Sequence, residues 1–310
     1  MTGSVLCTGN IVLDILTRPV DEITWGGTRW VDSIEQSLGG NGANTSAAMA
    51  KLGVPVKLIG GVGRDAFGDA ALARLMECGV SIEFISRLDT PTAATVALVR
   101  SDGTRAFLHV PGVSRVLFSD PFVLPDGHAH LHIGNPFAIV HLRKLAPRLL
   151  REARQMGMTT SVDTAWDALG EWMTVAKPCL PHTGILFTNE DEARMLTGSS
   201  DPLTVAARLR EAGATNIVMK LGARGCAVFT TEGEWHVPAF NVNAVDTTGA
   251  GDCFAGAFLA ALHHGRRYPE AARVANAAGA LNVQSLGATS GLLSWDETLK
   301  WMRSAPVRSG

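Results

Sequence analysis

The sequence predicts an α/β protein with a mostly parallel central sheet that is covered by helices on both faces. Short apolar runs alternate with segments of helical periodicity along most of the 310 residues, which is typical of such sheets. Two β-branched runs, residues 92–100 and 104–110, flank Asp102-Gly103, a strong hairpin signal. Together with the irregular segment 12–37, this hairpin is predicted to form a small projecting sheet. We therefore expect a single domain, residues 1–310, with a core of residues 1–11, 38–90 and 113–310 and a projecting sheet of about 12–37 and 91–112.

The predicted strands are short apolar runs that end at glycine or at polar residues. In chain order they are residues 5–8, 56–62, 129–133, 158–162, 184–188, 216–220, a hairpin pair at 226–230 and 235–239, and a strand-like approach from Val237 to Val245. Polar residues follow several of these strands, namely Asp14, Asn41, Asp163, Asn189 and Asp252. In open α/β sheets ligands bind at the carboxyl ends of the strands, so these side chains are expected to converge.

The predicted helices end at glycines, which favour the left-handed conformation of a helix C-terminus. The terminating residues are Gly53, Gly79, Gly157, Gly198 and Gly213. Leu142, Leu145 and Leu149 fall on one helical face, and Asp201-Pro202 is the pattern of an N-cap followed by proline at the first helical position. Two long alanine-rich helices are predicted after residue 249.

Composition excludes several classes of partner. The formal net charge of -2 gives no electrostatic reason to expect nucleic acid or an anionic membrane. The five cysteines are scattered without a CxxC spacing, which favours reduced thiols over a disulfide framework. No apolar stretch approaches the length of a membrane span, and the N-terminus lacks a signal-peptide pattern. We expect a soluble cytoplasmic protein that acts on a small molecule.

The segment Asp246-Thr247-Thr248-Gly249-Ala250-Gly251-Asp252 is predicted to bind an anion. Its small residues leave backbone N–H groups open to a ligand, and the helix that begins there adds further unpaired donors and a partial positive charge. Asp252 places a carboxylate where an anion should bind. An acid in a first helical turn also stabilises the helix itself, but a simple cap does not need three small residues before it.

Phosphate binding by the commonest loops is excluded. No lysine follows a glycine, so there is no P-loop, and Gly9-Asn10 and Gly40-x-Gly42 lack the full dinucleotide pattern. What remains is a carboxylate beside an anion site, which suits phosphoryl transfer with Asp252 as the base. Glu192, three residues after Asn189, is placed to hold Mg²⁺ through water. An ordinary N-cap and first-turn acid would give the same Asn189/Glu192 pattern.

Two motifs resemble the signatures of the ribokinase-like (PfkB) carbohydrate kinases, and the resemblance is collinear over nearly the whole chain. They are Gly39-Gly40-Asn41-Gly42-Ala43-Asn44-Thr45-Ser46-Ala47-Ala48 and Asp246-Thr247-Thr248-Gly249-Ala250-Gly251-Asp252-Cys253-Phe254-Ala255-Gly256. Lesser marks agree: Gly9-Asn10 with Asp14, Val62-Gly63-x-Asp65-x-x-Gly68, Asn189-x-x-Glu192 and Lys220-Leu221-Gly222-x-x-Gly225. The resemblance implies a three-layer α/β/α fold in which the projecting sheet is a lid.

The resemblance also implies roles for single residues. Asp252 would be the catalytic base, with Gly249, Ala250 and Gly251 as the anion hole for the γ-phosphate of ATP. Asp14, Gly40, Asn41 and Asn44 would bind sugar hydroxyls, and Asn135 is a further candidate. Asn189, Lys220, Gly222, Gly225, Thr248 and Asn276 would line the ATP site, and Glu192 would organise Mg²⁺. The lid would exclude water, and its exposed edge would favour a homodimer.

Many members of this family hold a potassium ion beside the anion hole through carbonyl groups. The corresponding ligands here would be Asp246, Thr248, Asn282, Ser285 and Gly287. Gly291 stands where a serine ligand is expected, although Ser290 is adjacent.

Three other interpretations remain open. His128, His130 and His132 alternate on one face of a predicted strand and are candidate metal ligands of a hydrolase, or structural histidines. A non-catalytic sugar-binding protein of the same fold would have no use for a base at Asp252. A nucleoside kinase would need an aromatic slot, which Trp25 and Trp30 of the lid segment could supply, although packing of the lid or a dimer contact would also explain these tryptophans and is preferred. The interpretation that uses both glycine motifs is an ATP-dependent sugar kinase that phosphorylates a hydroxymethyl group of a monosaccharide.

Overall fold

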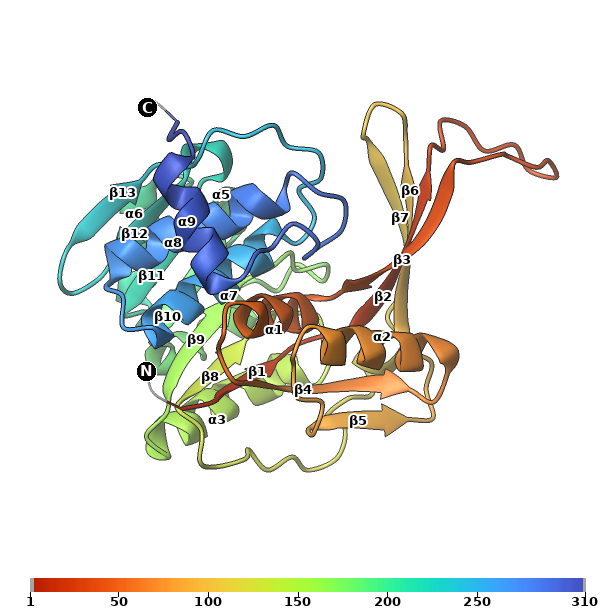
Figure 1. Ribbon diagram of the computed structural model, residues 1–310. Coiled ribbons are helices and arrows are strands. Elements are labelled where there is room, and N and C mark those ends of the chain that lie inside the picture. Colours follow the sequence, from red (N-terminus) through yellow and green to blue (C-terminus); the bar gives the residue numbers. More distant parts are fainter. Residues whose placement is uncertain (1–2, 309–310) are drawn as a thin grey trace.

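The computed structural model describes residues 3–308 and contains a large sheet and a small one (Figure 1). The large sheet has nine strands in the order β13-β12-β11-β10-β9-β8-β1-β4-β5. All neighbours are parallel except the pairs that β12 forms with β11 and β13. The strands are β1 (Val5–Thr8), β4 (Val56–Gly63), β5 (Ile85–Leu88), β8 (His130–Ile133), β9 (Thr159–Asp163), β10 (Ile185–Asn189), β11 (Asn216–Lys220), β12 (Cys226–Phe229) and β13 (Glu234–Val237).

The small sheet projects from the main body (Figure 1). Its strand order is β3-β2-β6-β7, and we call it the lid sheet. It consists of β2 (Val12–Arg18), β3 (Ser33–Gly39), β6 (Ala93–Val99) and β7 (Arg105–Val110). Because β2 follows β1 and β3 leads into the first helix, Asp14 of β2 is held close to the carboxyl end of β1.

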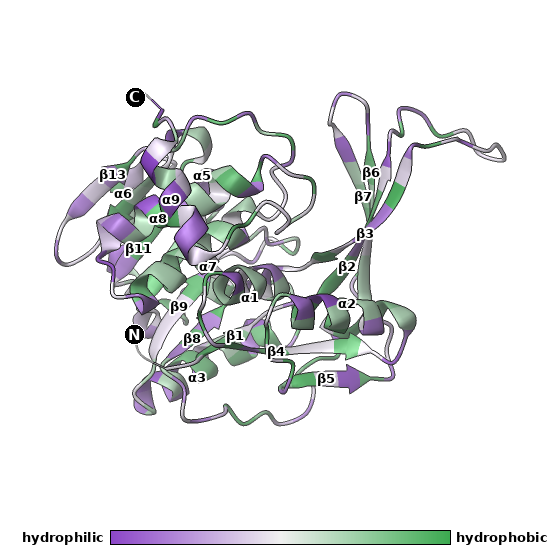
Figure 2. Cartoon of the chain, in the orientation of Figure 1, coloured by the Kyte–Doolittle hydropathy of each residue, from purple (hydrophilic) through white to green (hydrophobic). Residues whose placement is uncertain are grey.

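Helices cover both faces of the large sheet. They are α1 (Asn41–Lys51), α2 (Ala66–Glu77), α3 (Leu142–Gln155), α4 (Met173–Ala176), α5 (Glu190–Thr197), α6 (Pro202–Glu211), α7 (Ala250–His263), α8 (Tyr268–Asn282) and α9 (Trp295–Ser304). One apolar layer joins α1, α2, α7 and α8 to the sheet, and the other joins α3, α5 and α6 to it. The outer helix α9 is largely hydrophilic, whereas α7 is predominantly apolar (Figure 2). The two layers give the three-layer α/β/α arrangement that was expected.

Most of the predicted elements agree with observed ones to within a few residues, but β5, α4 and α9 were not predicted. One predicted element is wrong. The predicted strand from Val237 to Val245 does not exist, because β13 ends at Val237 and residues 238–249 form a loop. Proline cannot donate to a strand ladder, and Pro238 follows β13 directly. The Asn276 side chain donates to the carbonyl oxygens of Val237 (2.9 Å) and Pro238 (3.2 Å), so a side chain replaces the continuing strand.

Two further findings concern the chain as a whole. Within residues 3–308, no helix has the length and apolar character that a bilayer crossing requires. All five cysteines are free thiols, and burial raises the pKa of Cys7 and Cys226 to about 12.

Candidate active site

Three cavities meet at the carboxyl edge of the large sheet. The largest, of about 560 Å³, lies between the lid sheet and α7, and the second, of about 330 Å³, lies beside α8. A third cavity of about 320 Å³ shares Asp252 with the first and Lys220 and Gly251 with the second. The three therefore provide two binding sites joined at the N-terminus of α7.

Asp252 lies in the first turn of α7 at this junction and is only 8% exposed. Its Oδ1 accepts a hydrogen bond from Asn41 Nδ2 (2.8 Å), and its Oδ2 accepts one from Asn44 Nδ2 (2.8 Å). Burial raises the pKa of Asp252, although the two amide hydrogen bonds and the nearby Lys220 charge oppose the shift. A carboxylate with a raised pKa that lines a cavity is a candidate general base.

Close packing of α1 against α7 brings the two signature motifs together. A Cβ atom at Gly256 of α7 would lie 2.7 Å from Ala48 Cβ of α1 and 2.8 Å from Thr45 O. Similarly, a Cβ atom at Gly42 would lie 2.7 Å from the backbone of Gly9 at the end of β1. Real Cβ atoms do not approach this closely, so the small residues of both motifs are required for the approach that places Asn41 and Asn44 on Asp252.

Gly249, Ala250 and Gly251 form the turn that opens α7, as predicted. Gly249 has a φ of +70°, and a Cβ atom there would lie 2.4 Å from Ala288 O. A Cβ atom at Gly251 would lie 3.3 Å from Lys220 Nζ, so the turn directly faces a cation. First-turn N–H groups lack partners within the helix. The turn and Lys220 thus present backbone N–H groups and an ammonium group at the third cavity.

Lys220 forms an ion pair with Asp163, which was predicted from the sequence only as a polar residue at the end of a strand. Its Nζ atom lies 2.7 and 2.9 Å from the two carboxylate oxygens of Asp163 at the end of β9. Burial opposes the charge on Lys220, but Asp163 and Glu192 outweigh it and raise the pKa of the ammonium. Burial also raises the pKa of Asp163, which Lys220 counteracts.

Asn189 and Glu192 form a complete capping box at the start of α5. Asn189 Oδ1 accepts from the Glu192 N–H (2.9 Å), and Glu192 Oε2 accepts from the Asn189 N–H (3.1 Å) and from the Thr164 hydroxyl (2.9 Å). Glu192 Oε1 accepts from Asn189 Nδ2 (2.7 Å). Glu192 is 6% exposed and lines the third cavity. Both of its oxygens already have protein donors, so it would hold a metal ion through water more readily than directly.

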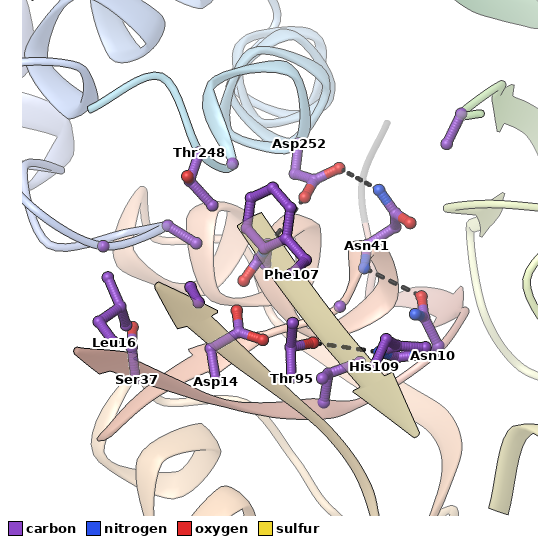
Figure 3. Close-up of a pocket in the computed structure, with 18 of the residues that line it drawn as sticks. Asn10, Asp14, Leu16, Ser37, Asn41, Thr95, Phe107, His109, Thr248 and Asp252 are labelled. Carbon is purple, nitrogen blue, oxygen red and sulfur yellow. Dashed lines mark hydrogen bonds between the residues drawn. The ribbon is translucent and has the colours of Figure 1, made fainter. Parts of the chain in front are cut away.

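The largest cavity is lined from two sides (Figure 3). Asp14, Thr95 and His109 come from the lid sheet, and Asn41 and Asp252 come from α1 and α7. Burial raises the pKa of Asp14, and a hydrogen bond with Thr95 opposes the shift. A Cβ atom at Gly39 would lie 2.1 Å from Asp14 Oδ2. The cavity thus places carboxylate and amide groups around a space suited to several hydroxyl groups.

The remaining predicted polar residues of this cavity form a short network. Asn41 Oδ1 accepts from Asn135 Nδ2 (3.0 Å), and the Asn41 N–H donates to Asn10 Oδ1 (3.0 Å). Gly40 has a φ of +92°, and a Cβ atom there would lie 2.4 Å from Asn10 O. The network fixes the direction in which Asn41 presents its amide to Asp252.

The second cavity contains the other residues predicted to line a nucleotide site. Lys220, Gly222, Gly225 and Asn276 line it, together with apolar side chains that include Phe240. Thr248 does not line this cavity and instead lines the largest one, at the N-terminal side of α7. An apolar slot that leads to an anion-binding turn is suited to a purine ring followed by phosphates.

Several oxygens of the residues predicted to hold a potassium ion already have partners within the protein. Asp246 Oδ1 accepts from the Thr248 N–H (2.7 Å) and pairs with Arg105 Nη1 (2.7 Å), and Oδ2 accepts from the Gly287 N–H (2.9 Å). The Thr248 carbonyl accepts from Asn282 Nδ2 (3.0 Å). Ser285 donates its N–H to Asn282 O (3.1 Å). Two of the predicted carbonyl ligands and the Asp246 carboxylate thus have protein partners, and the guanidinium of Arg105 occupies the position of a cation beside that carboxylate.

The three histidines are held by hydroxyl groups, and only His130 and His132 lie on a strand, β8, because His128 precedes it. His130 and His132 are fully buried and both lie 2.7–2.8 Å from Ser161 Oγ, and His128 Nδ1 lies 2.7 Å from Ser4 Oγ. Burial lowers the pKa of His130 to about 3. In residues 3–308 no group of three histidine, cysteine or acidic side chains is placed to hold a metal ion.

Several residues of the site were missed or misplaced from the sequence. Trp25 and Trp30 do not line the largest cavity and are 95% and 87% exposed, whereas Phe107 and Trp166 do line it. Arg105 was not predicted as a site residue, and Asp163 was expected at the ligand-binding edge of the sheet without a role of its own. Arg105, Phe107 and His109 alternate along β7, so the period of two is a signal that could have placed them on one face.

Comparison with known proteins agrees with this geometry. The profile described as pfkB family carbohydrate kinase matches residues 3–295. The chain is 32% identical to an ATP-dependent ribose-1-phosphate kinase of Halopiger xanaduensis over 92% of this chain and 94% of that protein. It is 30% identical to a ribokinase of Arabidopsis thaliana over 86% of this chain and 72% of that protein.

A solved structure shares the fold. The structure of Arabidopsis thaliana ribokinase complexed with ribose and ATP superposes with a TM-score of 0.84 at 26% identity, covering 98% of this chain and 99% of that one. The family match spans both signature motifs and almost all described residues. This chain has the ribokinase fold and belongs to the pfkB family of carbohydrate kinases, which are phosphotransferases.

Proposed function

We propose that this chain transfers the γ-phosphate of ATP to a hydroxymethyl group of a monosaccharide. The observation that carries the proposal is the position of Asp252. It lines both the largest cavity and the third cavity, and the third cavity is also lined by Lys220. In this arrangement the largest cavity takes the sugar, and the cavity beside α8 takes the nucleotide. Asp252 is the only acidic side chain of residues 3–308 that lines both the largest cavity and the third cavity, which connects the other two and which we call the connecting cavity.

In the proposed mechanism Asp252 accepts the proton of the attacking hydroxyl group. The hydrogen bonds from Asn41 and Asn44 orient its two oxygens, and burial keeps the carboxyl a better base than in water. Gly249, Ala250, Gly251 and Lys220 hold the charge that develops on the transferring phosphoryl group. Asp14 and Asn135 bind the other hydroxyl groups of the sugar.

The connecting cavity also suits Mg²⁺ bound to the nucleotide. It presents oxygens of Asp163, Asn189 and Glu192, which are the hard ligands that Mg²⁺ prefers. Glu192 would hold the ion through water, because its oxygens already accept hydrogen bonds. When bound, Mg²⁺ would neutralise part of the negative charge of the phosphates.

A nucleoside kinase is the second candidate, and one observation favours it. Phe107 and Trp166, which are 59% and 60% exposed, both line the largest cavity. Aromatic rings are suited to stacking on a nucleobase. With a volume of about 560 Å³, the cavity also has more room than a free pentose needs.

A panel of pentoses, hexoses and nucleosides with Mg-ATP tests both candidates. We expect sugar-dependent ADP release with at least one monosaccharide, measured by a coupled assay. Preferential turnover of nucleosides would favour the second candidate, and ADP release that no acceptor stimulates would contradict both.

Asp14→Asn should raise the KM of the accepted substrate about 10- to 100-fold, because a charged hydrogen-bond acceptor is lost, and leave the KM for ATP unchanged. The matched control is Asp21→Asn, since Asp21 also lies on the lid segment but is bonded to Ser101 on the surface. Equal KM values in the Asp14 variant and the control would remove Asp14 from the sugar site.

We also propose that the lid sheet mediates a homodimer. Ile34 and Leu108 on the two edge strands of the lid sheet are 68% and 63% exposed, and Trp25 and Trp30 in the loop between β2 and β3 are 95% and 87% exposed. Large exposed apolar side chains can mark an interaction surface. Sedimentation equilibrium should give twice the mass of one chain. Replacing Trp30 and Leu108 together by glutamate should then yield the single-chain mass, and a monomeric unmodified protein would contradict the proposal.

A further inference from the structure

Arg105 links the lid sheet to the loop that precedes α7. It is the first residue of β7, on the edge of the lid sheet, and its Nη1 atom lies 2.7 Å from Asp246 Oδ1. The same nitrogen donates a hydrogen bond to the Thr248 hydroxyl. The two partners are 141 and 143 residues away in the sequence, so this contact exists only when the lid lies against the core.

The carboxylate that Arg105 contacts is completely enclosed. The Asp246 side chain is 0% exposed and that of Arg105 is 16% exposed. Burial opposes ionisation of Asp246, but hydrogen bonds from Gly287, Thr248 and Arg105 outweigh it and lower the pKa of the carboxyl. A buried carboxylate is costly unless it is paired. Among the described residues, Arg105 supplies the cation of that pair.

The Asp246 carboxylate also holds the loop that leads into Gly249, Ala250 and Gly251, and we call these three residues the anion turn. It accepts the N–H groups of Thr248 and Gly287, and Thr248 is followed directly by Gly249, the N-cap of α7. Arg105 also lines the largest cavity, so the residue that pairs with Asp246 belongs both to the lid sheet and to the wall of that cavity.

We propose that Arg105 holds Asp246 and the anion turn from the lid sheet, in the place that a monovalent cation would otherwise take. This inference rests on the proposed kinase function. When the lid sheet closes on the core, the guanidinium of Arg105 pairs with Asp246 and holds the anion turn in position. Turnover then does not require potassium. Arg105 acts through Asp246 and Thr248 and is a positioning residue.

The test compares kcat in KCl, NaCl and choline chloride at equal ionic strength, with the acceptor found in the panel. Unmodified protein should turn over at rates that agree within about twofold in the three salts. Arg105→Met keeps the length of the side chain but removes the charge, and should lower kcat roughly 10- to 100-fold, with a smaller change in the KM for ATP. Low millimolar guanidinium chloride should restore at least part of the loss, and Arg105→Lys should be less impaired than Arg105→Met.

The matched control is Arg100→Met, because Arg100 is an exposed arginine of the same lid hairpin. It should behave as the unmodified protein does. A more than tenfold dependence of the unmodified protein on potassium would overturn the inference, as would unchanged kcat in Arg105→Met or a loss that guanidinium does not relieve.

Hydrogen exchange of residues 244–252 separates this inference from the kinase function. Protection of this segment should be the same in all three salts for the unmodified protein. In Arg105→Met it should fall in choline chloride and recover with guanidinium. If no acceptor is phosphorylated, the kinase proposal fails, whereas the exchange pattern still decides whether Arg105 holds the loop.

Discussion

Replacing Asp252 by asparagine is expected to lower kcat by about 10²- to 10⁴-fold, the usual contribution of a positioned general base, while ATP binding is retained. The change should be tolerated by the fold. Asn44 Oδ1 is buried without a hydrogen-bond partner in the described structure, so the Asn44 amide can turn to accept from the new amide group. Steady-state kinetics and ATP titration measure the two effects separately.

The control for this variant is Asp296→Asn in the first turn of α9. Both changes remove a first-turn acid, and each should cost about 0.3–1 kcal/mol through the helix dipole. Only the Asp252 variant should lose turnover. If both variants keep near wild-type kcat, Asp252 is a helix-stabilising residue and the proposed mechanism is wrong.

The pH profile gives an independent check on the same residue. The base must be ionised to accept a proton, and burial raises the pKa of Asp252. The ratio kcat/KM should therefore be constant near neutral pH and fall as the pH drops through that raised pKa. The residual activity of Asp252→Asn should lack this acidic limb. A limb that persists in the variant would assign it to another group.

Lys220→Met is expected to lower kcat by about 10²- to 10³-fold and to raise the KM for ATP, because a preorganised cation beside the transferring phosphoryl group is lost. The ammonium also lowers the pKa of Asp252, so the acidic limb of the pH profile should move to higher pH. Kinetics at several pH values measure all three effects. Unchanged kcat and KM would remove Lys220 from the phosphate site.

A double variant separates catalysis from stability. Removing one partner of a buried ion pair typically costs about 3–5 kcal/mol, whereas removing both can be nearly neutral. Lys220→Met alone should therefore lower the melting temperature, and adding Asp163→Asn should recover much of it without recovering activity. Lys57→Met removes a lysine from the surface pair with Glu83 and serves as the control, since exposed pairs contribute about 0–1 kcal/mol.

Much of the site could be predicted because its chemistry is local. Asp252 and the Gly249–Gly251 turn are adjacent in sequence, and glycine-rich turns at helix starts have few structural uses. The helix ends at Gly53 and Gly198 depend on positive φ values, +83° and +75°, which glycine adopts at little cost. Such features are decided within a few residues, so their residue types reveal them.

The failures arose where distant segments compete for the same partners. Val237 to Val245 has the composition of a strand, but Asn276 of α8 takes the carbonyl groups of Val237 and Pro238. An aromatic slot at Trp25 and Trp30 was one alternative, but both lie on the exposed lid segment, whereas Phe107 and Trp166 line the largest cavity. Neither outcome depends on local propensity.

The sequence by itself determined the α/β class, the order of most elements and the glycine-rich turn with its acid at the start of a helix, because backbone conformation and periodicity express these locally. Only the tertiary structure decided what surrounds Asp252. It placed two amides of α1 on the carboxylate, Lys220 with Asp163 beside the turn, and Arg105 on Asp246. These contacts join residues between 57 and 211 positions apart. Sheet order and the close packing of small residues in α1 and α7 bring them together, and no local pattern encodes that distance.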